Sequence, residues 1–340
     1  MTSSSTSPAV APAPGATMSA IVQREYGTDA AAVLRPSTAP VPSPEANQVL
    51  VRIHATSVDQ GTWHLMAGLP YPVRAAFPGI RRPRRLNPGL PLAGTVVAVG
   101  EGVRNLRPGD RVFGEGSSTL AQYAVADRRA IGLMPAGLSF PDAAAAAVSG
   151  VTALQAVRDH AGVAEGERVL VLGAGGGVGS YAVQLAKAAG ASVTAVCSTG
   201  KVEAVHTLGP DEVIDYRRSE PTGRYDVILD TGGMRPLPVL RRLLTERGRL
   251  VIVGGENGGR WLGGSQRQVL ASLLSPFVRQ SLGTFMTKKS ETDLVELGGL
   301  LERGVLRSLV ESSHPLADAA EAMRRLTDGA AAGKVVVTVD

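Results

Sequence analysis

The sequence predicts an α/β protein in which a doubly wound parallel sheet follows a domain made mainly of β strands. Strand and helix patterns alternate in the second half of the chain, at 168–172, 180–190, 192–197, 201–208, 212–216, 225–230, 236–246 and 249–254. This alternation is typical of parallel strands joined by crossover helices. Residues 18–134 instead carry short apolar alternations between turns rich in Pro and Gly, which is typical of β structure.

Length and composition favour two soluble domains. A chain of 340 residues is long for one core, so we expect a site in the cleft between two domains. Hydrophobic residues make up 44%, and no apolar run reaches the roughly 18 residues of a membrane span. The single Cys197 excludes an internal disulfide and favours a reducing cytoplasm.

The net charge of +5 does not predict a nucleic-acid partner. Aromatic residues are only 4%, whereas a nucleic-acid surface combines a basic stripe with stacking aromatics. We expect the one dense basic cluster, residues 81–85, to be a solvated loop near an anionic cofactor. The expected partner is a small molecule, with neither nucleic acid nor a membrane.

The first elements follow a low-complexity start. Residues 1–17 lack periodicity and positive charge, so we expect a disordered extension and not a secretory signal. Strand patterns follow at 20–23, 48–55, 94–100 and 111–114. Ser139 is a candidate helix N-cap, and helical patterning runs from it to residue 162 with a break near Ser149.

The strand 168–172 leads directly into a turn with the sequence Gly173-Ala-Gly-Gly-Gly-Val-Gly179. Glycine lets the backbone reverse tightly, lets a pyrophosphate approach the N–H groups, and lets the following helix pack on the strand. The positive end of that helix would face the same anion. A flexible surface loop is the alternative, but the flanking strands and helix favour a dinucleotide-binding turn in a Rossmann sheet.

The second strand of this unit ends without an acid. Sites that prefer NAD usually place Asp or Glu about 20 residues after the first glycine. This chain reads Cys197-Ser-Thr-Gly-Lys201 there, and its first acid, Glu203, lies inside the next helix. A hydroxyl and an ammonium attract a 2′-phosphate, so Ser198 and Lys201 predict NADPH, with Tyr216 as a further contact. An ordinary solvated lysine is the alternative.

The last quarter of the chain does not extend a dinucleotide fold. A glycine-rich stretch, 255–264, leads to an apolar helix and a strand at 281–288. A helix over 292–303, a strand near 306–311, a helix over 317–328 and a strand at 335–339 follow. We expect these elements to return to the first domain.

Several motifs in one order resemble the zinc-independent medium-chain dehydrogenase/reductases, the quinone oxidoreductase-like proteins. They are residues 58–66, 108–114, 149–155, the glycine turn, 211–216 and 333–337, and the likeness covers 18–340. It implies a GroES-like β barrel at 18–137 and 290–340 and a Rossmann domain at 138–289, with 1–17 outside. It also implies a homodimer in which the strand at 281–288 extends the sheet across a two-fold axis.

The resemblance also implies a cofactor site for NADPH. The glycine turn would hold the pyrophosphate, Ser198, Lys201 and Tyr216 the adenosine phosphate, and Asp59 would lie beside the nicotinamide ribose. The full candidate set is Asp59, Thr152, Gly173, Gly175, Gly176, Gly177, Val178, Gly179, Ser198, Lys201, Tyr216, Thr231, Gly232, Val253, Gly254 and Lys334.

No catalytic zinc is expected. The zinc-dependent relatives keep a cysteine where this chain has Asp59, and Gly-His-Glu where it has Gly89-Leu-Pro91. Neither Leu90 nor Pro91 can bind a metal. Pro91 also departs from the zinc-free branch, in which an acid or a polar residue is common at that place.

A site without a metal favours a conjugated acceptor. Hydride adds to carbon of a quinone or an α,β-unsaturated carbonyl, and the charge spreads into an enolate that hydrogen bonds can stabilise. Candidate catalytic residues are Tyr71 as a hydrogen-bond donor, His64 as a proton source and Trp63 as an apolar wall. We expect Asp59 to be an exposed, ionised carboxylate that orients the ribose. A packing role is the alternative for His64.

Two other functions stay open at this point. One is a specialised ketone or enoyl reductase of a biosynthetic pathway, and the other is a non-catalytic NADPH-binding redox sensor. A short-chain dehydrogenase is disfavoured because none of the six tyrosines has a lysine four residues later. A P-loop enzyme is disfavoured because Val178-Gly-Ser180 lacks the required lysine.

Overall fold

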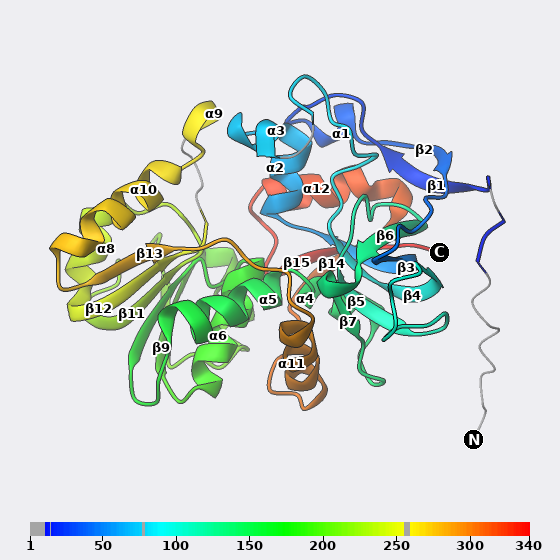
Figure 1. Cartoon of the computed structure of the whole chain (residues 1–340). Coiled ribbons are helices and arrows are strands. Elements are labelled where there is room, and N and C mark those ends of the chain that lie inside the picture. Colours follow the sequence, from blue (N-terminus) through cyan, green and yellow to red (C-terminus); the bar gives the residue numbers. More distant parts are fainter. Residues whose placement is uncertain (1–10, 14, 77–78, 255–258) are drawn as a thin grey trace.

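Two sheets lie side by side in the computed structural model (Figure 1). The structure describes residues 11–13, 15–76, 79–254 and 259–340. Residues 1–10 and 14 of the expected extension lie outside the described residues. The last residue of that extension is ordered, because Thr17 begins β1 (Thr17–Val22) and pairs with Pro40 of β2 (Arg35–Pro40).

The second half of the chain forms the predicted doubly wound parallel sheet. Its strands lie in the order β10-β9-β8-β11-β12-β13, so the chain starts at the centre with β8 and moves outward in both directions. All neighbouring pairs are parallel. The strands are β8 (Arg168–Leu172), β9 (Ser192–Cys197), β10 (Glu212–Asp215), β11 (Tyr225–Asp230), β12 (Leu244–Ile252) and β13 (Ser281–Thr284). Ligands of such sheets bind at the carboxyl ends of the strands, where the strand order reverses.

Helices connect these strands, and two boundaries differ from the expectation. Helix α6 (Gly177–Ala188) begins three residues before 180, because the last glycines of the turn already form its first turn. Helix α8 (Leu237–Leu243) ends three residues before 246, because Leu244 is buried and pairs with Tyr225, so that β12 begins there. The other connections are η3 (Thr199–Lys201), α7 (Val202–His206), α9 (Gly259–Leu262), α10 (Ser265–Leu274) and η4 (Ser275–Phe277).

A seven-stranded sheet corresponds to the expected GroES-like part. Its order is β14-β15-β3-β4-β5-β7, and β6 pairs with β3. The last strand, β15 (Lys334–Thr338), pairs antiparallel with β3 (Gln48–Val58). The C-terminal part of the chain therefore returns to the seven-stranded sheet that β3 begins. The other strands are β4 (Pro91–Val99), β5 (Arg111–Glu115), β6 (Tyr123–Asp127), β7 (Ile131–Leu133) and β14 (Val310–Pro315).

Strand β14 lies four residues later than the strand expected near 306–311. Residues just before it bond to helices instead of to a sheet: the Arg307 N–H donates to the Gln184 side chain at 2.9 Å, and the Ser308 hydroxyl to the Asp142 carbonyl at 2.8 Å. The strand expected at 281–288 is likewise shorter and ends at Thr284.

The remaining helices lie around the second sheet and between the two sheets. They are α1 (Ala30–Val33), α2 (Gln60–Ala67), α3 (Pro72–Ala76), η1 (Arg128–Ala130), α4 (Phe140–Ala146), α5 (Ser149–Leu154), the π-helical η2 (Gln155–Ala161), α11 (Glu291–Glu302), η5 (Leu316–Asp318) and α12 (Ala319–Thr327). Ser139 caps α4 as predicted, because its side chain accepts the Asp142 N–H. Among the described residues, no helix combines the length and apolarity needed to cross a membrane.

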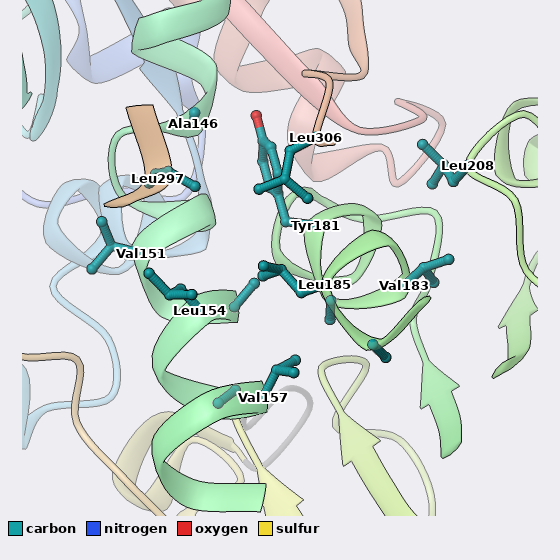
Figure 2. Packing of buried hydrophobic residues seen from close by; sticks show 14 of the residues in the cluster. Ala146, Val151, Leu154, Val157, Tyr181, Val183, Leu185, Leu208, Leu297 and Leu306 are labelled. Carbon is teal, nitrogen blue, oxygen red and sulfur yellow. The ribbon is translucent and has the colours of Figure 1, made fainter. Parts of the chain in front are cut away.

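An apolar core holds α6, the helix that follows the glycine turn. Figure 2 shows Val157 of η2 on the side of its helix that faces Leu185 of α6, and Leu154 of α5 and Tyr181 belong to the same apolar cluster. Burying such a side chain fully contributes about 1.5–3 kcal/mol. Tyr181 is fully buried, which raises the pKa of its phenol, and its hydroxyl donates to Ser308 at 2.7 Å. These contacts fix the start of α6, and with it the glycine turn, against α5.

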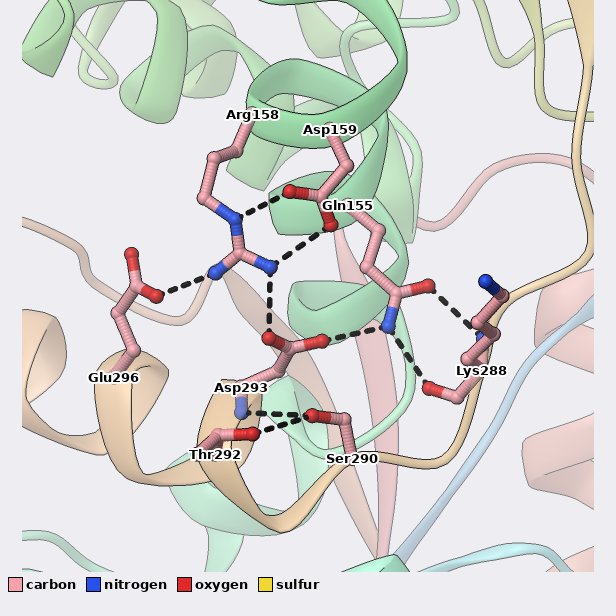
Figure 3. A network of polar contacts seen from close by, with 8 residues as sticks. All are labelled: Gln155, Arg158, Asp159, Lys288, Ser290, Thr292, Asp293 and Glu296. Carbon is pink, nitrogen blue, oxygen red and sulfur yellow. Dashed lines mark hydrogen bonds and ion pairs between the residues drawn. The ribbon is translucent and has the colours of Figure 1, made fainter.

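A polar network anchors the chain where it leaves the parallel sheet (Figure 3). Arg158 pairs with Asp159, Asp293 and Glu296, and these carboxylates raise the pKa of its guanidinium further. Gln155 donates to Asp293 at 2.7 Å and accepts the Lys288 N–H at 2.9 Å. The network therefore holds α11 and the segment after β13 against α5 and η2.

Candidate functional site

The glycine turn has the backbone that a dinucleotide-binding turn needs. Gly173 has φ +81°, and a Cβ added there would lie 2.7 Å from the Thr231 hydroxyl. Gly176 is the N-cap of α6, and Gly177, Val178 and Gly179 form its first turn. The N–H groups at a helix start have no partner within the helix and are available to an anion.

The carboxyl ends of three strands meet at this turn. The Thr231 hydroxyl, just after β11, donates to the Leu172 carbonyl of β8 at 2.8 Å. Gly254, two residues after β12, lies close to Thr231, because a Cβ added to it would be 3.0 Å from the Thr231 carbonyl oxygen. Gly232 directly follows Thr231 after β11, and Val253 directly precedes Gly254 after β12. The predicted nicotinamide-side residues of the parallel sheet are thus brought together.

Thr152 reaches this region from α5, but its hydroxyl already has partners. It donates to the Val148 carbonyl at 2.8 Å and lies 3.0 Å from the Thr287 hydroxyl. Thr287 belongs to the segment after β13 that the network in Figure 3 holds in place. Sequence reasoning did not find Thr287, because the contact joins residues 135 positions apart.

Lys334 brings the second sheet to the glycine turn. The N–H of Gly333 donates to the Gly175 carbonyl at 2.9 Å. A Cβ added to Gly177 would lie 2.8 Å from Cδ of Lys334, so only glycine leaves room for this side chain. The Lys334 ammonium is buried, donates to the Val58 carbonyl at 3.1 Å, and has a pKa lowered by burial.

Asp59 faces Lys334 and is not the exposed carboxylate that we expected. Its side chain is only 15% exposed, because it caps α2 and lies against β15. Oδ1 accepts the Thr62 N–H at 2.9 Å and the Thr62 hydroxyl at 3.0 Å. Oδ2 is 3.7 Å from the Lys334 ammonium and has no hydrogen-bond partner. An orphaned buried acceptor of this kind fits a hydroxyl group of a ligand.

Lys201 and Ser198 lie at the adenosine end of the predicted site. The Lys201 side chain extends over the glycine turn, since its Cδ would be 2.7 Å from a Cβ on Gly175. Burial lowers the pKa of Lys201, and no carboxylate of the described residues forms an ion pair with it. Tyr216 is 44% exposed, and its N–H donates to the Cys197 carbonyl at 3.1 Å, next to Ser198.

Charged residues that sequence reasoning missed flank this end. Asp215 ends β10 beside Cys197, and a hydrogen bond from the Thr199 side chain lowers the pKa of its carboxyl. Arg218 lies 3.4 Å from Asp215, and Arg217 is exposed beside it. The sequence signal was present as two arginines directly after Tyr216. These arginines follow the third strand of the unit, whereas the usual signal for the adenosine end lies at the end of the second strand.

His64 is neutral and already bonded. Its Nδ1 is 2.7 Å from the Leu69 carbonyl, so Nδ1 carries the proton and Nε2 does not. Burial lowers the pKa of the imidazole, against smaller opposing effects of the Leu69 carbonyl and Asp59. Trp63 packs on the cluster that includes Met323 of α12, which is a structural contact. Neither residue is poised as a proton donor by these contacts.

Tyr71 lies where the two domains touch. Its N–H donates to the Arg260 carbonyl of α9 at 2.8 Å, and its ring meets the Trp261 ring edge-on at 5.1 Å. The Arg74 guanidinium lies 4.9 Å from the centre of the Tyr71 ring. No contact in the described part of the chain joins the Tyr71 hydroxyl to Asp59 or Lys334. Trp261 was not among the predicted residues, because the glycine-rich stretch around it carries no periodic pattern.

Leu90 presents an apolar side chain near Asp59. A Cβ added to Gly61 of α2 would lie 3.9 Å from Leu90 and 3.2 Å from Asp59. Pro91 is buried at the start of β4, and its carbonyl accepts the Thr56 hydroxyl at 2.6 Å. No group of three or more His, Cys, Asp or Glu side chains with metal-binding geometry occurs in the part of the chain that the structure describes.

Comparisons with known proteins place this architecture among oxidoreductases. Residues 45–190 match the family described as alcohol dehydrogenase GroES-like domain, and 208–337 the family described as zinc-binding dehydrogenase. The chain is 33% identical to a chloroplast envelope quinone oxidoreductase homolog of Arabidopsis thaliana, over 95% of this chain and 99% of that protein. It is 30% identical to a 2-methylene-furan-3-one reductase of Solanum lycopersicum, over 88% of this chain and 74% of that protein.

A solved structure shows the same fold. The quinone oxidoreductase from Coxiella burnetii has a TM-score of 0.80 and 26% identity, over 96% of this chain and 100% of that chain. The shared architecture includes both sheets, since nearly all of each chain is covered.

Proposed function

Because the chain belongs to the quinone oxidoreductase-like medium-chain dehydrogenase/reductases, we propose that it transfers hydride from NADPH to a quinone or an α,β-unsaturated carbonyl compound. The observation that carries this proposal is the meeting of Lys334 and Asp59 with the glycine turn. A nicotinamide cofactor would find N–H groups for its phosphates at the glycine turn, and the charged side chains of Lys334 and Asp59 beside them. When bound, the cofactor supplies the hydride.

The residues present fit such a cofactor. The N–H groups of Gly177 and Val178, in the first turn of α6, suit a pyrophosphate, and the orphaned Oδ2 of Asp59 suits a ribose hydroxyl. The buried Lys334 ammonium keeps Asp59 oriented and lies beside the start of α6. These contacts are supplied by α2, α6 and β15, so the site needs both sheets.

The preference for NADPH rests on local charge. Lys201 carries a positive charge over the glycine turn without a carboxylate partner among the described residues, and the Ser198 hydroxyl lies nearby in sequence. Arg217 and Arg218 add positive charge at the same edge, and Asp215 is already engaged by Thr199 and Arg218. A 2′-phosphate would therefore meet more cations than anions.

A conjugated acceptor follows from the side chains opposite the cofactor. Leu90 and Pro91 offer no metal ligand where the zinc-dependent relatives hold one, so an alkoxide would lack a Lewis acid. An enolate needs only hydrogen-bond donors and the exclusion of water. The reductase of Solanum lycopersicum, named for an enone, supports this class of acceptor.

Tyr71 is the better of the two candidate donors. A phenol hydroxyl donates a hydrogen bond without changing its charge state, whereas the only proton of neutral His64 is held by the Leu69 carbonyl. Tyr71 also lies on a segment that meets α9, so its position depends on both parts of the chain. His64 is then a positioning residue for the 64–71 segment.

A homodimer is part of the proposal. Strand β13 is the last strand of the parallel sheet, and its outer edge has no neighbour among the described strands. Exposed apolar side chains flank it, with Phe277 84% and Met286 88% exposed. Monomeric proteins rarely leave such a strand edge and its apolar neighbours exposed to solvent.

We also propose that the protein works in a reducing compartment such as the cytoplasm, because Cys197 is a free thiol.

The decisive experiment is a turnover screen that follows the loss of NADPH or NADH absorbance with quinones, enones, enoyl thioesters and simple ketones. We expect turnover with quinones or enones, preference for NADPH, and no loss of activity with a chelator. Turnover of enoyl thioesters alone would favour a specialised biosynthetic reductase. Tight NADPH binding with no turnover would favour a redox sensor.

A further inference from the structure

An arginine-lined pocket lies at the opposite end of the parallel strands from the glycine turn. Its volume is about 550 Å³, and it is lined by Arg224, Pro238, Arg241, Arg242, Glu246, Val278, Arg279 and Gln280. Arg224 directly precedes β11 and Gln280 directly precedes β13, so the pocket is at the amino ends of these strands. Figure 1 shows α8, β12 and β13 on the side of the molecule away from β15.

The pocket carries a strong positive charge. Its lining holds four arginines and one glutamate. Glu246 pairs with Arg279, and no carboxylate of the described residues forms an ion pair with Arg224, Arg241 or Arg242. Three guanidinium groups gathered without counter-charges repel one another, which an anionic ligand would relieve.

Two of the four arginines, Arg241 and Arg224, are held in place without using up their donors. Arg241 donates through Nε to Gln280 at 3.0 Å, and Gln280 donates back to the Arg241 carbonyl at 3.0 Å. Arg224 donates through Nη1 to the Leu244 carbonyl at 3.0 Å. A guanidinium has five N–H donors, so each keeps several for a ligand. Arginine held in this way suits the paired oxygens of phosphate groups.

We propose that this pocket binds a small molecule that carries adjacent phosphate groups, at a site separate from the nucleotide cleft. The depression is open to solvent, since the side chains of Arg279 and Glu246 are 73% and 71% exposed, and its volume is larger than one phosphate needs. Pro238 and Val278 give the pocket an apolar wall for the rest of the ligand. Inorganic pyrophosphate and a nucleoside diphosphate share the recognised chemistry.

The test is calorimetric titration of inorganic pyrophosphate, ADP and citrate into the full chain, alone and with saturating NADPH. We expect pyrophosphate and ADP to bind in both conditions and citrate to bind about tenfold more weakly, because adjacent phosphates place more negative charge and more acceptor oxygens in one spot than separate carboxylates do. Tighter binding of ADP than of pyrophosphate would assign the apolar wall to the nucleoside, and equal binding would assign recognition to the phosphates alone. Citrate binding as tightly as pyrophosphate would overturn the proposal.

Variants separate the pocket from general charge. Arg241→Gln/Arg279→Gln is expected to weaken pyrophosphate binding about tenfold or more, since two charge-assisted contacts are lost. The control, Arg104→Gln/Arg247→Gln, removes the same charge from exposed residues outside the pocket lining and should change binding less than about twofold. The single variant Arg242→Gln, at an exposed side chain, serves if the double variant unfolds. Two results would overturn the proposal: unchanged binding of pyrophosphate in the pocket variants, or loss of pyrophosphate binding in Lys201→Met instead.

Discussion

The ammonium of Lys334 lies 3.7 Å from Oδ2 of Asp59, and this pair joins the last strand of the chain to the helix that follows β3. Lys334 is 2% exposed, so the two charges meet largely out of water. Removing one partner of such a pair leaves the other uncompensated, which is destabilising. The pair is thus both a structural link and the candidate wall of the cofactor site.

Lys334→Met should weaken cofactor binding and stability together. We expect the dissociation constant for NADPH to rise about tenfold or more and the free energy of unfolding to fall by about 1–3 kcal/mol, because Asp59 loses its cation. Fluorescence titration and thermal unfolding measure the two effects. Asp59→Asn is the matched variant: it keeps an N-cap for α2 but removes the charge, so it should lose binding with a similar loss of stability, because the buried Lys334 ammonium is then uncompensated. Normal NADPH affinity in both variants would remove the pair from the site.

Lys201→Met should change cofactor preference. We expect kcat/KM for NADPH to fall about 10- to 100-fold, the value of a charge-assisted hydrogen bond, while kcat/KM for NADH stays the same. Steady-state kinetics with both cofactors checks this. Lys187→Met is the control, because Lys187 pairs with Asp211 and lies at the other end of α6. An equal loss with NADH would show that Lys201 does not read the 2′-phosphate.

His64 should make the protein less stable in mild acid. Burial lowers the pKa of His64 below its ordinary value of 6.5, so below that pH the unfolded chain takes up a proton that the folded chain does not. The stability present above pH 6.5 is therefore lost as the pH falls toward the folded pKa. Chemical denaturation between pH 8 and pH 5, about the range in which histidine titrates, should show a steeper loss for the wild type than for His64→Asn. Parallel profiles would contradict the buried, neutral imidazole.

The open edge of β13 should mediate dimerisation. Phe277→Lys/Met286→Lys places charges on two highly exposed apolar residues, so we expect monomers in place of dimers with little change in the fold of each chain. Light scattering after size exclusion measures the mass. Val295→Lys, at a residue 58% exposed on α11, is the control and should stay dimeric. A wild-type chain that is monomeric at all concentrations would reject the dimer.

Local signals allowed the sequence to predict the parallel sheet. The turn at Gly173 and the apolar runs of β8, β9 and β11 are properties of neighbouring residues, and the structure has them at the expected places. The errors have a non-local cause. β14 is displaced because Arg307 bonds to Gln184, more than a hundred residues away in sequence.

The candidate site was predicted in part for the same reason. Lys201 and the glycine turn lie close in sequence and in space, so their pattern could be recognised together. The burial of Asp59 was missed because it depends on Lys334, which is 275 residues later. The contact of Tyr71 with Trp261 was missed because Tyr71 directly precedes the short helix α3 and Trp261 lies within the short helix α9, and neither helix is long enough to show an amphipathic repeat.

The hydrogen bond from Gly333 to Gly175 has a consequence for biosynthesis. A chain still emerging from the ribosome can complete all six parallel strands while residue 334 has yet to be translated. Until the final strand arrives, the phosphate-binding turn lacks its neighbour and Asp59 lacks its counter-ion. We therefore expect capture of the nucleotide only after residues 333–338 have been synthesised and β15 has paired with β3.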